Sequence, residues 1–213
     1  MGVQVKICGL STPESITAAV AGGASFLGFV FFPPSPRYIP VAEALPLVMP
    51  VPKDVKRVGL VVNAGDDLLD AITETLPLEY LQLHGDESPE RVATIRMRTN
   101  LPVIKVLKIS TPEDLGQVKV YSDISDMLLF DAKPPEGADR PGGHGAPFDW
   151  DILKGLETPL PWLLGGGLTS ENVTEAIDRT GAHMVDVSSG VEAAKGVKDT
   201  GRIQAFLKAV KAV

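Results

Sequence analysis

Short apolar segments rich in β-branched residues recur along the whole chain, spaced by roughly 22 to 30 residues with one longer gap. Segments of this length and composition are typical of strands that are buried on both faces. Eight such segments are present: Val3–Ile7, Phe26–Phe32, Val55–Val62, Tyr80–Leu83, Pro102–Ile109, Met127–Phe130, Trp162–Leu164 and Met184–Val187. This repeat limits the chain to folds in which short strands alternate with longer connections.

The stretches between these segments carry helix start signals. Ser88-Pro89-Glu90 offers a hydroxyl N-cap, a proline at the first helical position and an acid in the first turn. Similar signals occur at Ser11–Glu14, Thr111–Glu113 and Thr169–Asn172. Gly181 is a predicted helix stop. The helix predicted over 41–49 is the exception, because Pro46 is expected to break its interior.

Strands and helices that alternate at about 25 residues per unit predict an α/β protein with an all-parallel sheet. An open doubly wound sheet usually has fewer strands, and no dinucleotide-binding fingerprint follows the first segment. We therefore predict one compact domain over residues 1–213, a (βα)8 TIM barrel of small size. The Pro- and Gly-rich stretch from Lys133 to Pro147 is predicted to be a loop over the end of the barrel, with a passive surface excursion as the alternative.

Composition and charge narrow the function classes. With 213 residues, of which 44% are hydrophobic, the chain can bury a sizeable core. No apolar run approaches the roughly 20 residues that cross a bilayer, and the first residues lack a signal peptide's pattern. Together with a single cysteine, this predicts a cytoplasmic protein. The net charge of −7 argues against nucleic acid or an anionic membrane as a partner.

Polar residues occur near the carboxyl ends of four predicted strands, where a βα barrel has its catalytic face. Side chains two apart on a strand share a face, and the relevant pairs are Lys6 with Cys8, Gln82 with His84, Leu129 with Asp131, and Asp186 with Ser188. Each has a plainer interpretation: packing for Cys8 and His84, and bracing of a loop for Asp186. Asp131 is the hardest to explain by packing, because a carboxylate after an apolar strand must be desolvated or paired. Four such pairs predict a site inside the barrel mouth.

Two glycine-rich segments, Gly165–Leu168 and Ser188–Val191, follow the last two predicted strands. In βα barrels these two loops commonly bind a phosphate group through backbone N–H groups. They predict a small phosphorylated ligand. No cluster of His, Cys and carboxylates has metal-ligand spacing, so we predict no metal.

Ordered motifs run from one end of the chain to the other. They are Lys6–Leu10, Gly28–Phe31, Ser35–Arg37, Leu81–Asp86, Leu129–Asp131, Phe148–Trp150, Gly165–Leu168 and Asp186–Glu192. On these motifs the chain closely resembles the phosphoribosylanthranilate isomerases of tryptophan biosynthesis. Two small departures are a glycine at 165, where the family has alanine, and Gly196 after Lys195, where proline is usual.

The resemblance implies an intramolecular oxidoreductase of the aldose–ketose type that needs no cofactor. The family converts N-(5-phosphoribosyl)anthranilate to 1-(2-carboxyphenylamino)-1-deoxyribulose 5-phosphate by an Amadori rearrangement. By resemblance, Asp131 is the general acid, Cys8 is the base and Arg37 binds the anthranilate carboxylate. The remaining substrate-binding residues that it implies are His84, Gly166, Gly167, Asp186, Ser188, Ser189 and Gly190. Lys6, on the face of Cys8, is our own candidate for a cation that favours the thiolate.

Two other functions are compatible with parts of the pattern. The related sugar isomerase of histidine biosynthesis runs the same rearrangement, but it has an aspartate where Cys8 stands. A non-catalytic barrel that binds a phosphorylated ligand is the second alternative, disfavoured because Cys8 and Asp131 are both present. We expect a monomer, with a homodimer as the alternative.

Overall fold

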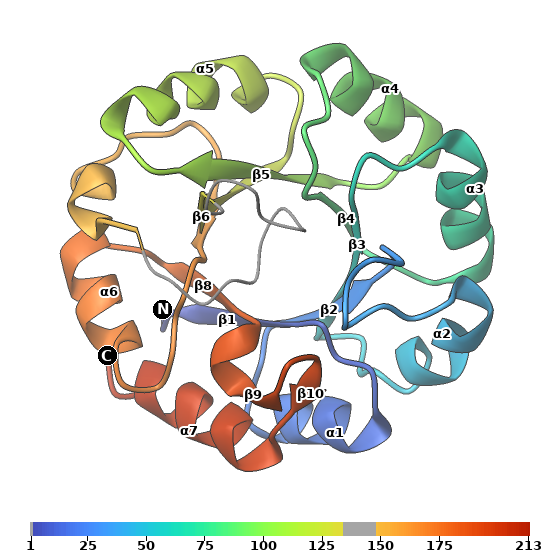
Figure 1. Ribbon diagram of the computed structural model, residues 1–213, viewed down its shortest axis with the longest axis horizontal. Coiled ribbons are helices and arrows are strands. Elements are labelled where there is room, and N and C mark those ends of the chain that lie inside the picture. The colour runs from blue at the N-terminus through green and yellow to red at the C-terminus, as the bar shows by residue number, and fades with distance from the viewer. Residues whose placement is uncertain (1, 134–147) are drawn as a thin grey trace.

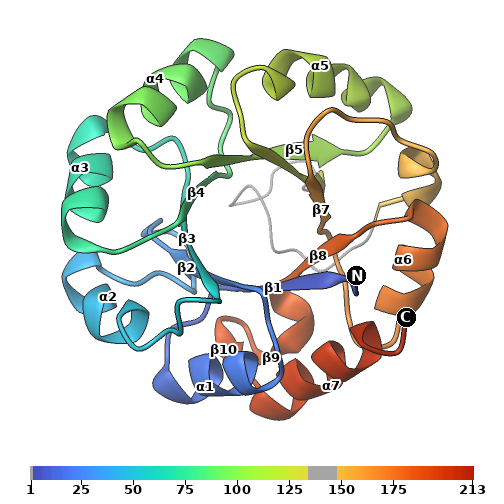
Figure 2. The ribbon, with the colours of Figure 1, turned by 180° about the vertical axis from the view of Figure 1, so that it is seen from behind.

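The computed structural model describes residues 2–133 and 148–213 and shows a barrel of parallel strands inside a ring of helices (Figure 1). The strands follow one another in chain order, each paired with the next, and β8 pairs with β1 to close the sheet. The predicted TIM barrel is therefore confirmed. Figure 2 views the barrel from behind, where the N-terminus faces the reader.

Eight strands form the barrel, and all eight were predicted with boundaries that agree within two residues. They are β1 (Gln4–Cys8), β2 (Phe26–Val30), β3 (Lys56–Val61), β4 (Tyr80–Leu83), β5 (Val103–Ile109), β6 (Met127–Ala132), β7 (Trp162–Leu164) and β8 (Met184–Val187). The differences that matter are at two carboxyl ends. Strand β1 continues to Cys8 and β6 continues to Ala132, so Cys8 and Asp131 belong to the strands themselves.

Seven α-helices are found in the described part of the chain. They are α1 (Pro13–Ala21), α2 (Val41–Val48), α3 (Asp66–Thr75), α4 (Pro89–Thr99), α5 (Gly116–Ser122), α6 (Val173–Thr180) and α7 (Thr200–Val210). The predicted N-caps Thr12 and Ser88 accept hydrogen bonds from the first turns of α1 and α4. Gly181 ends α6 with a φ of 72°, as predicted. None of the described helices is long and apolar enough to span a bilayer.

Short 3-10 turns and a hairpin complete the described elements. The turns are Pro112–Leu115, Trp150–Leu153 and Ser189–Val191. After the last turn, β9 (Glu192–Ala194) pairs antiparallel with β10 (Val197–Lys198), and this hairpin lies between α1 and α7 in Figure 1. The loop predicted from Lys133 to Pro147 lies outside the described residues from position 134 onward.

The helix predicted over 41–49 is confirmed, whereas the break expected at Pro46 was wrong. Helix α2 runs through this proline to Val48. Proline removes one hydrogen bond, here the one to the carbonyl of Ala42 in the first turn. Both residues are exposed, so water can satisfy that carbonyl and the short helix persists.

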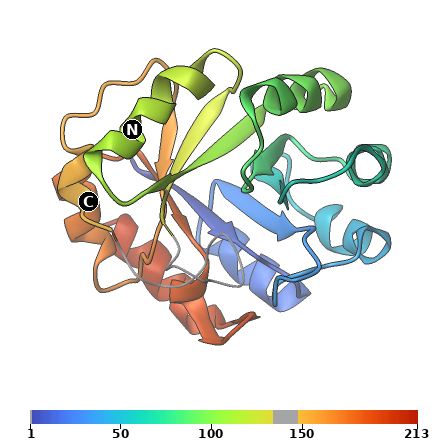
Figure 3. The same ribbon diagram turned by 45° about the horizontal axis from the view of Figure 1, so that its top comes forward.

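Apolar side chains form two shells, one inside the barrel and one between strands and helices. The inner cluster contains Phe26, Val58, Ile104, Val106, Met127, Leu129, Leu163 and Met184. Residues of opposite parity, such as Leu81 and Phe130, pack outward against the helices in the larger cluster. The tilted view in Figure 3 shows the strands enclosed by this helical layer. The inner faces turn polar toward the carboxyl ends, where Gln82 and Asp131 are buried, so the polar site lies on top of an apolar plug.

We expect Phe206→Ala to lower the free energy of unfolding by about 3–5 kcal/mol, because this fully buried side chain joins α7 to the outer shell. Met97→Ala is the control, since Met97 on α4 is 84% exposed, and it should change stability by less than about 0.5 kcal/mol. Denaturant titration measures both. Equal effects for the two variants would contradict this description of the core.

Candidate functional site

Cys8 lies at the carboxyl end of β1, beside a buried lysine–carboxylate pair. Nζ of Lys6 is 2.8 Å from Oδ1 of Asp186 on the neighbouring β8. Lys6 is fully buried and Cys8 is 4% exposed. A Cβ atom at Gly28 would be 2.9 Å from Sγ of Cys8 and 3.2 Å from Nζ of Lys6. The glycine on β2 therefore provides the space that the thiol and the ammonium group occupy.

The electrostatics of this corner favour a neutral thiol at rest. Burial raises the pKa of the Cys8 thiol, Lys6 counteracts that rise, and Asp186 adds to it. The pKa of Lys6 is raised as well: burial alone would lower it, and the charge of Asp186 and the proximity of Cys8 outweigh burial. Lys6 thus lowers the pKa of Cys8, in the direction expected from the sequence. Because burial and, secondarily, the charge of Asp186 outweigh Lys6, the net shift of the Cys8 pKa is upward, away from the thiolate.

Asp131 and His84 face each other across the mouth, from β6 and the end of β4. Nε2 of His84 is 3.2 Å from Oδ2 of Asp131. The side-chain amide of Gln82, which is fully buried, lies 3.1 Å from Nδ1 of His84. When this amide donates to Nδ1, the imidazole hydrogen is on Nε2. Nε2 has no aligned hydrogen-bond partner among the described residues, so it remains available to a substrate.

Arg37 is buried in an ion pair with Glu192. Its Nε and Nη2 donate to the two carboxylate oxygens of Glu192 at 2.6 and 2.9 Å. The side chains are 6% and 5% exposed. Gly9, which follows Cys8 with a φ of 76°, makes room for Arg37, because a Cβ atom there would be 2.5 Å from Cδ of the arginine. Arg37 therefore lies next to Cys8, with Nη1 outside the Glu192 pair.

Lys198 on β10 connects Glu192 to the loop after β8. Its Nζ is 2.9 Å from Oε1 of Glu192 and donates to the carbonyl and hydroxyl oxygens of Ser188 at 2.8 and 3.2 Å. The hydroxyl of Ser188 in turn donates to the carbonyl of Cys8 at 3.1 Å. Burial lowers the pKa of Lys198, and the charge of Glu192 counteracts this effect. A continuous polar chain thus runs from Arg37 to Cys8.

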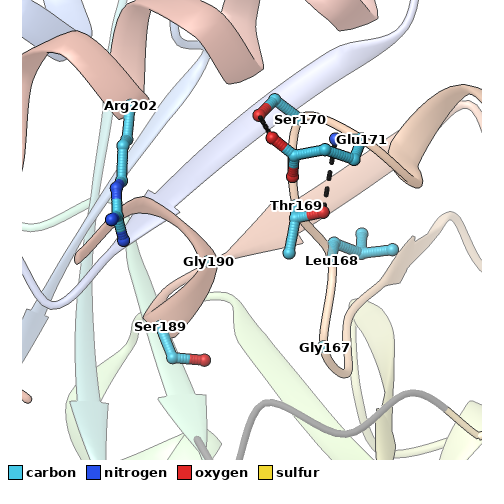
Figure 4. A pocket seen from close by; sticks show the side chains of 8 residues that line it. All are labelled: Gly167, Leu168, Thr169, Ser170, Glu171, Ser189, Gly190 and Arg202. Carbon is cyan, nitrogen blue, oxygen red and sulfur yellow. Dashed lines mark hydrogen bonds between the residues drawn. The ribbon is translucent and has the colours of Figure 1, made fainter. Parts of the chain in front are cut away.

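A hollow of about 470 Å³ opens between the loops that follow β7 and β8 (Figure 4). Its lining includes Gly167, Ser189 and Gly190, and the side chain of Arg202 from the first turn of α7 points toward it. The backbone N–H groups of these two glycines and of Ser189 have no hydrogen-bond partner within the described residues. Unpaired N–H donors and a guanidinium group suit an anion.

The two loops of the hollow are in direct contact. A Cβ atom at Gly190 would overlap the carbonyl oxygen of Leu168. Only glycine fits there, because the obstructing atom is backbone and cannot rotate away. Gly166 lies elsewhere, with a virtual Cβ atom 2.7 Å from the backbone nitrogen of Ala132. Gly166 therefore packs against the carboxyl end of β6, next to Asp131, and does not line the hollow.

Eight of the ten predicted site residues fall into three groups, while Arg37 lies in the pair with Glu192 and Gly166 lies beside Ala132. Cys8, Asp186 and Ser188 form one corner, Asp131 and His84 form another, and the hollow contains Gly167, Ser189 and Gly190. Sequence reasoning missed Lys198 and Arg202, which reach these groups only through the β9–β10 hairpin and the first turn of α7. Within residues 2–133 and 148–213, no group of three His, Cys or acidic side chains is arranged to hold a metal ion.

This arrangement is that of a (βα)8 barrel with a polar site and a glycine-lined hollow at the carboxyl ends of its strands. Residues 5–209 match the family model described as N-(5'phosphoribosyl)anthranilate (PRA) isomerase. The chain belongs to this family.

Relatives with the same name are similar over nearly the full length. N-(5'-phosphoribosyl)anthranilate isomerase of Cereibacter sphaeroides is 53% identical over 210 residues, covering 99% of each chain. That of Rhodospirillum rubrum is 52% identical over 211 residues, covering 97% of each. The structure of phosphoribosyl anthranilate isomerase from Thermotoga maritima superposes with a TM-score of 0.88 at 37% identity, covering 99% of this chain and 100% of that one.

Lys6 and Asp186 should shift the Cys8 pKa in opposite directions. Lys6→Met removes a cation and leaves Asp186 unpaired, so the thiol pKa should rise further. Asp186→Asn removes the anion and should lower it. Because the chain has one cysteine, a pH titration of 13C-labelled cysteine by NMR gives one resonance to follow. Shifts in the same direction for both variants would rule out this electrostatic description.

Proposed function

We propose that the protein catalyses the Amadori rearrangement of N-(5-phosphoribosyl)anthranilate to 1-(2-carboxyphenylamino)-1-deoxyribulose 5-phosphate, in tryptophan biosynthesis. The observation that carries the proposal is the placement of a buried thiol and a buried carboxyl group, Cys8 and Asp131, on separate strands at one barrel mouth. A solved family member in complex with the reduced product, 33% identical with a TM-score of 0.82, supports a ligand of this class.

The first step needs an acid. Asp131 donates its proton to the furanose ring oxygen, the bond between that oxygen and the anomeric carbon breaks, and the nitrogen lone pair forms an iminium ion. The iminium ion is the electron sink, so the chemistry requires no cofactor.

The second step needs a base. Cys8 removes the proton from C2 of the sugar, and the released electron pair forms a carbon–carbon double bond while the iminium nitrogen becomes neutral. The resulting enolamine tautomerises to the ketone. Cys8 is a thiol at rest because burial raises its pKa. The positive iminium ion beside it favours loss of the thiol proton to solvent water, so the first step prepares the thiolate that then takes the C2 proton.

The two anionic ends of the substrate have separate binding groups. Arg37 binds the anthranilate carboxylate, with Nη1 directed to the ligand while Nε and Nη2 stay with Glu192. The phosphate enters the hollow lined by Gly167, Ser189 and Gly190. His84 donates from Nε2 to the substrate near Asp131.

The cellular setting is part of the proposal. A biosynthetic enzyme with this single thiol suits the cytoplasm. We propose that the protein acts as a monomer. A homodimer remains the alternative, since the phosphoribosylanthranilate isomerase of Thermotoga maritima is dimeric and its solved structures include monomers generated from that dimer.

Loss of anthranilate fluorescence in the presence of phosphoribosylanthranilate measures the reaction. Cys8→Ala and Asp131→Asn should each lower kcat by at least about 100-fold, with smaller effects on substrate binding, because each removes a proton-transfer group. Asp126→Asn is the control, since Asp126 pairs with exposed Arg96 away from the mouth. Near-normal turnover in Cys8→Ala or Asp131→Asn would remove that residue from the mechanism.

Arg37→Ala should lower kcat/KM about 10- to 150-fold, chiefly through KM, because a charged hydrogen bond to the substrate is worth roughly 1.5–3 kcal/mol. Arg57→Ala is the matched control. It breaks the pair of Arg57 with Glu79 at the amino end of β3, opposite the barrel mouth, and should leave kcat/KM near wild type.

A product analogue without the carboxylate separates the two roles open to Arg37. Wild type and Arg37→Ala should bind this analogue about equally. If the variant loses affinity equally for analogues with and without the carboxylate, Arg37 supports the loop or the phosphate and does not recognise the anthranilate group.

A further inference from the structure

The cluster of Arg37, Glu192 and Lys198 buries two cations with one carboxylate. All three side chains are at most 6% exposed. Glu192 is fully engaged: its oxygens accept from Arg37, from Lys198 and from the N–H of Gly196 at 3.0 Å. A buried cation without its own counterion is unfavourable. The excess positive charge therefore favours an anion nearby, and the hollow lies beside the cluster through Ser188.

Lys198 determines how one peptide group of the hollow is turned. Its Nζ holds the carbonyl oxygen of Ser188 at 2.8 Å. The peptide bond between Ser188 and Ser189 is trans, as no described peptide is cis, so the N–H of Ser189 points away from that carbonyl. Ser189 lines the hollow. Ser188 has an irregular backbone conformation, φ −129° and ψ −77°, and besides Lys198 its carbonyl accepts, among the described residues, only a long hydrogen bond of 3.4 Å, from the N–H of Val191.

We propose that Lys198 is a positioning residue for phosphate binding. By holding the Ser188 carbonyl, it turns the N–H of Ser189 toward the phosphate, and Glu192 keeps its ammonium group in place. Lys198 does not touch the substrate. This inference rests on the proposed function only in that the hollow takes the substrate's phosphate.

The same cluster connects the recognition of both anionic ends. Glu192 orients Arg37 through two hydrogen bonds and Lys198 through one. Gly196, at the turn of the β9–β10 hairpin with a φ of 82°, packs on Pro36, where a Cβ atom would be 2.5 Å from the carbonyl oxygen. The hairpin thus holds Arg37, the proposed partner of the carboxylate, and Lys198, which lies behind the phosphate loop, in fixed positions relative to each other.

The barrel contains a matched control for a buried lysine of this kind. Lys105 on β5 is also buried, pairs with Glu87 at 2.6 Å and donates to the carbonyl of Gly85 at 2.8 Å. It therefore holds a backbone carbonyl next to a glutamate, as Lys198 does, but at the loop after β4 and away from the hollow. Loss of Lys105 should lower stability without affecting phosphate binding.

The test measures binding of inorganic phosphate by calorimetry, together with KM and kcat. Lys198→Met should raise the Kd for phosphate about 10-fold or more and raise KM by a similar factor, with kcat at saturation close to wild type. Lys105→Met should leave the Kd for phosphate unchanged. Lys198→Arg keeps a charged donor and should recover most of the phosphate affinity.

Lys198→Gln is the second variant if Lys198→Met fails to fold. Its neutral, shorter amide still donates to Glu192 but does not also hold the Ser188 carbonyl, so phosphate binding should weaken in the same way. Wild-type phosphate affinity in either variant overturns the proposal, as does an equal loss in Lys105→Met. If the wild-type protein binds phosphate but shows no isomerase activity, and Lys198→Met abolishes phosphate binding, the proposed reaction is refuted and the role of Lys198 stands.

Discussion

Hydrogen bonding between β1 and β8 closes the barrel, and the Cys8 corner of the site depends on that closure. The register places Lys6 directly opposite Asp186, so the two side chains meet on the inner face of the closing pair. Because Cys8 is two residues beyond Lys6, it points into the same space. A shift of one residue in this register would turn the side chains of one of the two strands outward into the helical layer and separate Lys6 from Asp186. Closure thus fixes the fold and places the thiol beside its ion pair in a single step.

In the proposed mechanism, the polar groups of the mouth divide into a part for proton transfer and a part for anion binding. The groups proposed for proton transfer, Cys8 and Asp131, lie on barrel strands, where Cys8 pairs with Gly28 of β2 and Asp131 pairs with Lys108 of β5. The proposed anion site uses the loops after β7 and β8 and the small β9–β10 hairpin. Loops adapt to ligands more readily than strands do. In this barrel, buried charges such as Lys198 limit the mobility of these loops because they hold loop carbonyls in place.

Local patterns predicted the barrel because strand burial and helix caps depend on near neighbours. The apolar segments predicted all eight strands, and Ser88 predicted the start of α4. The pairing of Arg37 with Glu192 was not predictable, since the partners are 155 residues apart and no periodicity relates them. Lys198 and Arg202 escaped prediction for the same reason. Pro46 was misjudged because its cost depends on whether water reaches one carbonyl, which the sequence does not state.

The contact between Gly190 and the Leu168 carbonyl limits how this barrel can be redesigned. Since no side chain fits at position 190, a new ligand preference cannot be built by substitution there. Widening or recharging the hollow must instead proceed from positions whose side chains border it, such as Ser170 and Ser189. An engineer seeking a different ligand therefore has several open positions and a closed one, and a library that also randomises position 190 fills with misfolded chains.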